Sequence, residues 1–114
     1  MKIRFYRSSD REALHSYHLT DLRFTNHPSQ AVADLENRYA ILGLAEHKIV
    51  TFLILDAGEK KFTYGGQPES LLLRSFSTDE GFRMRGYGSQ TLKLLPDFIR
   101  EHLPMYKSII LGVN

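Results

Sequence analysis

The 114-residue chain is long enough for one compact domain over residues 1–114 and too short for two, and its 42% hydrophobic and 25% charged residues are typical of a globular protein. Its formal net charge of +2 is too small for a protein that binds nucleic acid through charge alone. The absence of cysteine excludes disulfides, thiolate nucleophiles and zinc sites with cysteine ligands. Charged residues begin too early for a signal peptide, and no apolar run approaches the roughly 20 residues that span a bilayer, so we expect a cytoplasmic protein without membrane contact.

The first part of the chain predicts one short strand and two helices. Residues 3–6 alternate apolar and basic side chains, which favours a strand. Ser9 and Glu12 form a capping-box pattern, which predicts a helix that continues to about residue 19. A second, short helix is predicted to begin at Pro28, with Ser29 as its N-cap.

Two long apolar runs rich in β-branched residues follow, at 39–46 and 48–57, and predict an antiparallel hairpin. The connection near His47 has no Asn-Gly or Asp-Gly pair, so we expect a less regular turn. The polar segment 59–70 is predicted to be a loop, with a frayed strand end at 62–64.

The last part of the chain predicts a strand, a helix and a strand. Residues 71–78 and 108–113 are the strands, and the spacing of apolar residues between them is helical. Pro96 should kink this helix, and Pro104 should end it. Two strands joined by one helix should lie parallel. The predicted fold is therefore α/β, a mixed α+β sheet with helices on its faces, and because the chain stops at a buried-looking strand we expect further sequence after residue 114.

A basic glycine loop, FRMRGYGSQ at 82–90, lies between the strand at 71–78 and the helix. Unpaired amides and the helix dipole make a helix N-terminus a phosphate site, and Gly86 and Gly88 would allow a pyrophosphate close to the backbone. The loop lacks the Gly-Lys-Ser/Thr of a Walker motif, and Thr91 replaces the third glycine of the dinucleotide fingerprint. The alternative is an ordinary glycine turn. Cationic side chains around the loop are Arg83, Arg85 and Lys93.

The stretch STDEGFRMRGYGSQTLKLL, residues 77–95, resembles motif A of the GNAT superfamily of acetyl-CoA-dependent N-acetyltransferases. Arg83, Gly86 and Gly88 match its Gln/Arg-x-x-Gly-x-Gly/Ala signature, and residues 78–80 occupy the acidic turn before it. The order of predicted elements also matches the first five strands and three helices of the GNAT-like acyl-CoA N-acyltransferase fold, which continues in the family with a further helix and two strands.

The resemblance implies acetyl transfer from acetyl-CoA to a primary amine of a small molecule, peptide or lysine, by direct attack on the thioester. The amides of residues 84–89 would hold the coenzyme pyrophosphate, and the strand backbone at 76–78 would bind the pantetheine arm, where this strand splays from the next. The implied cofactor-binding residues are Phe76, Ser77, Thr78, Arg83, Met84, Arg85, Gly86, Tyr87, Gly88 and Ser89.

The sequence departs from the family at the catalytic groups. The helix that often supplies a tyrosine as general acid would follow residue 114, and residues 71–73 carry no glutamate that could be a general base. The catalytic residues therefore stay unassigned. These departures motivate the alternative of a catalytically incomplete module that binds coenzyme A or forms a homodimer through an open sheet edge.

Four other side chains have two interpretations each. Arg74, inside an apolar strand, either meets an acidic substrate group or pairs with a carboxylate. Tyr17, His18 and Arg23 either line an acceptor pocket or simply pack. His15 and His18 have helical spacing, but no third ligand accompanies them and we predict no metal site. An RNA-binding function is not favoured, because the sequence has neither an aromatic stacking platform nor a long basic face.

Overall fold

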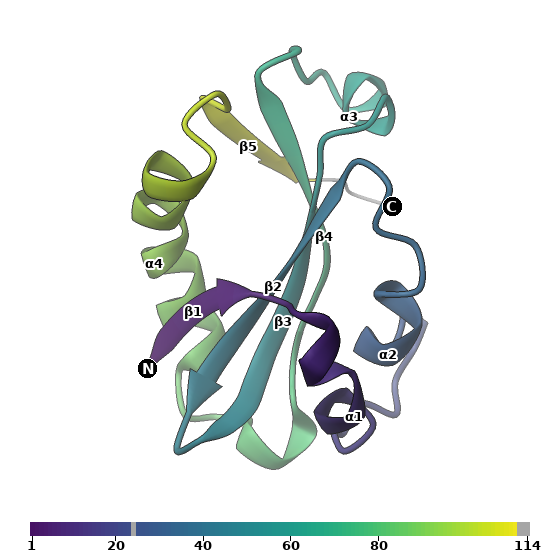
Figure 1. Ribbon diagram of the computed structural model, residues 1–114, viewed down its shortest axis with the longest axis vertical. Coiled ribbons are helices and arrows are strands. Elements are labelled where there is room, and N and C mark those ends of the chain that lie inside the picture. The colour runs from purple at the N-terminus through teal and green to yellow at the C-terminus, as the bar shows by residue number, and fades with distance from the viewer. Residues whose placement is uncertain (24, 112–114) are drawn as a thin grey trace.

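The computed structural model describes residues 1–23 and 25–111 and contains a five-stranded mixed sheet with helices on both faces (Figure 1). The strands lie in chain order, β1-β2-β3-β4-β5. Neighbours are antiparallel except β4 and β5, which are parallel and are joined by a helix, as expected. The strand bounds are β1 Lys2–Phe5, β2 Arg38–Ala45, β3 Lys48–Asp56, β4 Ser70–Thr78 and β5 Ser108–Leu111.

Alternation along the central strands sends apolar side chains into two separate cores. Ile41 and Leu53 pack with the buried face of helix α4 (Tyr87–His102), which covers one face of the sheet. Leu42 and Phe52, their immediate neighbours in the two strands, pack with α1 (Arg11–Leu14) and α2 (Pro28–Ala31) on the other face. Figure 1 shows α4 on one side of the sheet and α1 and α2 on the opposite side. This two-sided burial explains why β2 and β3 are long, almost uninterrupted apolar runs.

The hairpin of β2 and β3 confirms the predicted strand pair but not its predicted turn. Glu46 and His47 connect the strands and have φ angles of 54° and 63°. Positive φ at both central residues is the geometry of a type I′ turn, whose twist matches that of the strands. The prediction of a less regular turn was therefore wrong, because the strand pairing imposes the left-handed conformation on two residues that do not favour it.

The helices on the second face are shorter than predicted. The first is a 3₁₀ turn at Ser8–Asp10 followed by α1, which ends at Leu14 rather than near residue 19. The N-cap of α2 is His27, not Ser29. Its Nδ1 accepts the Ser29 amide at 3.1 Å, and its Nε2 donates to the Tyr17 carbonyl at 2.7 Å. A histidine caps this helix because the same ring also holds the segment that follows α1.

The remaining helices and strands agree with those predicted from the sequence, apart from one short helix. Residues 60–63 form helix α3 (Lys60–Thr63), not a loop with a frayed strand end. Helix α4 continues through Pro96 and ends at His102, two residues before Pro104, while the expected kink stays a prediction. The last two residues of the strand predicted at 108–113 lie outside the described residues. None of the helices in the described ranges has the length and apolar character needed to cross a membrane.

Arg74 pairs with a buried carboxylate, as one of its two interpretations predicted. Its Nη1 donates to Asp56 Oδ2 at 2.8 Å, and the Nε of Arg38 lies 3.3 Å from the same oxygen. The other carboxylate oxygen accepts the Gly58 amide at 2.8 Å. Burial opposes ionisation most strongly, but the hydrogen bonds and the two cations outweigh it and hold the pKa of Asp56 below its usual range. Asp56 therefore ties β2, β3 and β4 together at one end of the sheet.

Candidate functional site

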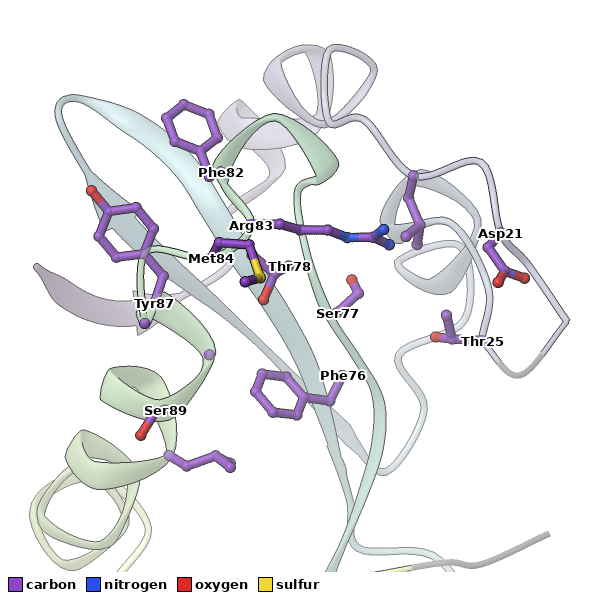
Figure 2. A pocket seen from close by; sticks show the side chains of 14 residues that line it. Asp21, Thr25, Phe76, Ser77, Thr78, Phe82, Arg83, Met84, Tyr87 and Ser89 are labelled. Atoms are coloured by element: carbon purple, nitrogen blue, oxygen red, sulfur yellow. The ribbon is translucent and has the colours of Figure 1, made fainter.

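A cavity of about 730 Å³ lies where β4 ends and α4 begins (Figure 2). Its walls come from the carboxyl end of β4, the glycine loop, the first turn of α4 and the segment between α1 and α2. The lining residues are Leu19, Asp21, Thr25, Phe76, Ser77, Thr78, Phe82, Arg83, Met84, Gly86, Tyr87, Gly88, Ser89 and Leu92.

One edge of β4 faces the cavity because the strand is irregular there. Its pairing with β3 shifts between Phe52 and Ile54, opposite Ser75, whose φ is 53°. An extra residue in one strand is a β-bulge, which bends the strand and re-aims the residues after it. On the other side, the described pairing with β5 covers only residues 70–73 of β4. Residues 76–78 thus have a described strand neighbour on one edge and the cavity on the other.

The glycine loop brings the start of α4 to the cavity wall. Gly86 is the N-cap residue of α4 and has a φ of 77°, which is left-handed and suits glycine. Gly88 lies against β4: a Cβ on it would be 3.3 Å from Thr78 Oγ1 and 3.6 Å from Phe76 Cζ. The first amides of a helix have no partner within the helix and lie at the positive end of its dipole. The first turn of α4 therefore brings backbone hydrogen-bond donors to this wall, and Gly86 and Gly88 add no side chains of their own there.

Thr91, which occupies the place of a third glycine, anchors α4 to the sheet instead. Its buried hydroxyl is 2.8 Å from Thr51 Oγ1 and donates to the Tyr87 carbonyl at 2.8 Å. The close approach is made possible by Gly43 on β2, where a Cβ would lie 1.8 Å from Thr51 Oγ1. The glycine that lets the helix approach is therefore on the sheet, which no local motif could reveal.

The acidic turn after β4 holds the segment that follows α1 at the cavity. The buried Asp79 accepts the His18 amide at 2.9 Å, and Glu80 accepts the Thr20 amide at 2.9 Å. The Glu80 amide in turn donates to the His18 carbonyl at 2.8 Å. Hydrogen bonds from Thr20 come first among the causes that lower the pKa of Glu80, so the carboxylate stays ionised. These contacts explain why the predicted helix stops early: the residues at its predicted end pair with Asp79 and Glu80, directly after β4.

Tyr17 contacts the site through one hydrogen bond and is otherwise part of the core. Its hydroxyl is 2.8 Å from Ser77 Oγ, and the side chain is buried. Burial, the largest cause, raises the pKa of the phenol well above its usual range. Tyr17 is therefore neutral at any ordinary pH. Its hydroxyl positions Ser77, which lines the cavity. Packing, the second of its two interpretations, describes its place behind this cavity, and both Tyr17 and His18 line a second cavity of about 490 Å³.

Nine of the ten predicted cofactor-binding residues line the cavity, and Arg85 does not. Arg85 lies 3.4 Å from a carboxylate oxygen of Glu46, with its guanidinium 5.2 Å from the Phe82 ring centroid. Lys93 is exposed on α4, and Arg23 is also outside the lining. Sequence reasoning missed Leu19, Asp21, Thr25, Phe82 and Leu92. For the first three no local signal existed, because long-range hydrogen bonds place their segment.

Comparison with known proteins shows to which family the chain belongs. No family model matches it. An uncharacterised N-acetyltransferase of Bacillus subtilis, YbbJ, is 32% identical over 120 aligned positions, which cover 100% of this chain and 75% of that protein. The chain belongs to the GNAT superfamily of N-acetyltransferases.

Solved structures of other GNAT proteins share the fold of this GNAT chain at low sequence identity. A GNAT family acetyltransferase of Staphylococcus aureus has a TM-score of 0.72 and 21% identity, over 99% of this chain and 86% of its own. A Brucella melitensis ribosomal-protein-alanine N-acetyltransferase has a TM-score of 0.65 and 16% identity, over 99% and 79%. AAC(6')-Iy, solved with the bisubstrate analogue CoA-S-monomethyl-acetylneamine, has a TM-score of 0.68 and 14% identity, over 99% and 79%. The fold class predicted from sequence is confirmed.

Proposed function

We propose that this GNAT chain transfers the acetyl group of acetyl-CoA to a primary amine. The observation that carries the proposal is the cavity itself, in which a glycine loop at a helix N-terminus faces the part of β4 that, within the described residues, has no strand neighbour on its β5 side. A coenzyme that combines a pyrophosphate with an extended amide-bearing arm needs both features.

In the proposed complex, the pyrophosphate lies at the amides of residues 84–89. Gly86 and Gly88 leave the backbone open there, and the dipole of α4 adds positive potential. The pantetheine arm lies along the backbone of residues 76–78 and bonds to it as an added strand would. Eight of the ten predicted residues belong to these two surfaces and line the cavity; Arg83 lines the cavity outside them, and Arg85 would contribute at most its backbone.

The proposed reaction is a direct displacement. The nitrogen of the neutral amine attacks the thioester carbonyl carbon, a C–N bond forms, the C–S bond breaks, and the coenzyme thiolate leaves and takes up a proton as the amine loses one. A backbone amide at residues 76–78 would stabilise the developing oxyanion, an effect worth roughly 3–4 kcal/mol. Holding both reactants in one cavity supplies much of the remaining acceleration.

Thiol release tests this function directly. Incubation with acetyl-CoA and a panel of primary amines should release free coenzyme A, detected with a thiol reagent, and add one acetyl group to the amine, detected by mass spectrometry. The chain has no cysteine, so the protein itself contributes no signal with the thiol reagent. Binding of acetyl-CoA without amine-dependent thiol release would favour the alternative of a non-catalytic coenzyme-binding module.

A further inference from the structure

The cavity carries very few charged side chains. Among the described residues that line it, only Asp21 and Arg83 are charged. Figure 2 shows the Arg83 side chain extending away from Tyr87 and Ser89 and toward Asp21. The charge of the cavity is therefore concentrated at the end opposite the first turn of α4, where an acceptor would approach the donor.

Asp21 is already paired within the protein. Its carboxylate accepts from Arg23 Nη2 at 2.9 Å and from Arg23 Nε at 3.0 Å, and it also accepts the Arg23 amide at 3.2 Å. These hydrogen bonds, the side-chain ones first, lower the pKa of Asp21 to about 2, and the charge of Arg83 adds to the effect. Asp21 is thus ionised, but the positive charge of Arg23 balances it, so Asp21 adds little attraction for a cationic acceptor.

Arg83 has hydrogen-bond donors to spare. Within the described residues its ionic contact is with Glu80, at 3.7 Å, which is beyond hydrogen-bond distance. Glu80 already accepts from the amide and the hydroxyl of Thr20, at distances of 2.8–3.1 Å. The Arg83 side chain is 56% exposed. A planar guanidinium with free donors binds a carboxylate through two parallel hydrogen bonds.

We propose that the acceptor is an amine that also carries a carboxylate, a free amino acid, and that Arg83 binds this carboxylate. The inference rests on the proposed function and names the substrate class of the same cavity. Ser77 belongs to the β4 segment that would hold the thioester, and it lines the same cavity as Arg83. Both groups of a small amino acid would then lie within this one cavity. A polycationic acceptor would find only Asp21 as an acidic side chain among the described lining residues, and that carboxylate is already paired with Arg23.

The test compares matched acceptors in the wild type and in Arg83→Gln. Thiol release is measured with the standard L-amino acids and, for each that reacts, with its primary amide, which keeps the amine and removes the carboxylate. The wild type should prefer the amino acid by about 10-fold or more in kcat/KM, as expected for one charged hydrogen-bonded pair. Arg83→Gln should lower this ratio by about 10-fold, mainly by raising KM for the amino acid. Arg83→Lys, which keeps the charge, should restore part of the preference.

Arg85→Gln is the matched control, because Arg85 is two residues away and outside the cavity lining. It should keep the wild-type ratio. Wild type that acetylates amides or other amines as well as amino acids overturns the inference alone, and so does Arg83→Gln that lowers both activities equally. If no amine releases thiol and calorimetry shows no acetyl-CoA binding, the proposed function fails and the inference fails with it.

Discussion

Gly88→Val is expected to weaken acetyl-CoA binding by at least roughly 100-fold, a loss of about 2.7 kcal/mol. A Cβ at this position already approaches Thr78 Oγ1 to 3.3 Å and Phe76 Cζ to 3.6 Å. The two methyl groups of valine would occupy the space between β4 and the first turn of α4, where the pyrophosphate is proposed to lie. Isothermal titration calorimetry measures the change in Kd, and circular dichroism checks that the fold is kept.

Gly86→Val is expected to have the same effect on binding, for a different reason. Gly86 has a φ of 77°, so valine there strains or moves the loop whose amides face the cavity. Gly65→Val is the matched control, because Gly65 has a φ of 84°, lies outside the cavity and has open space around its Cβ position. It should destabilise by a similar amount and leave Kd unchanged. Unchanged affinity in Gly86→Val or Gly88→Val would mean that the loop does not hold the coenzyme.

Asp56→Asn is expected to lower the free energy of unfolding by about 3 kcal/mol, because it leaves two arginines without their carboxylate. Asp56 is only 4% exposed, while the Arg38 and Arg74 side chains are about a third exposed. The loss in free energy of unfolding should therefore lie at the lower end of the range found when one partner of a buried ion pair is removed. Thermal unfolding should show a decrease in Tm of roughly 10 °C.

The pH dependence of the same variant gives a second readout. Because the pKa of Asp56 is lower in the folded protein than in the unfolded chain, its stabilisation is complete above the unfolded value of about 4 and is lost as the pH falls through the folded value. The difference in stability between wild type and Asp56→Asn should therefore shrink below about pH 4. Asp97→Asn, at an exposed Asp97–Arg100 pair on α4, is the matched control and should change little at any pH. Equal stability of Asp56→Asn and wild type at neutral pH would contradict the account.

The part of the cavity proposed to bind the donor could be located from the sequence because its signals are local. The apolar strand at 71–78, the glycine loop and the helical spacing after it lie within one continuous stretch of sequence. Each physical requirement, a strand end, residues without side chains and a helix N-terminus, has its own residue pattern there. That is why the predicted cofactor-binding residues, Arg85 excepted, line one cavity.

The part of the cavity proposed to bind the acceptor was not predictable, because contacts between residues distant in the sequence build it. Residues 15–19 have helical spacing, yet Asp79 and Glu80, about 60 positions away, accept amides of residues 18 and 20 and draw the segment out of the helix. Arg85 lies outside the cavity lining for a similar reason, since its partner Glu46 belongs to the hairpin turn of β2 and β3. Residue patterns report local preferences, and these long-range contacts override them.

The bulge in β4 is another feature that the local sequence did not reveal. Ser75 has a φ of 53° although serine has no preference for that region, and the pairing with β3 continues on either side of it. No turn-forming residue marks the position in the sequence. The irregularity is visible only once β3 is placed beside β4.

Titration of acetyl-CoA into the wild-type protein by isothermal titration calorimetry tests the central claim most directly, with adenosine 3′,5′-bisphosphate as the comparison ligand. The account predicts one site with a micromolar Kd for acetyl-CoA and weaker binding of the bisphosphate, which lacks both the pyrophosphate and the pantetheine arm. Absence of binding heat for acetyl-CoA, together with an unchanged Tm at saturating concentration, would contradict it.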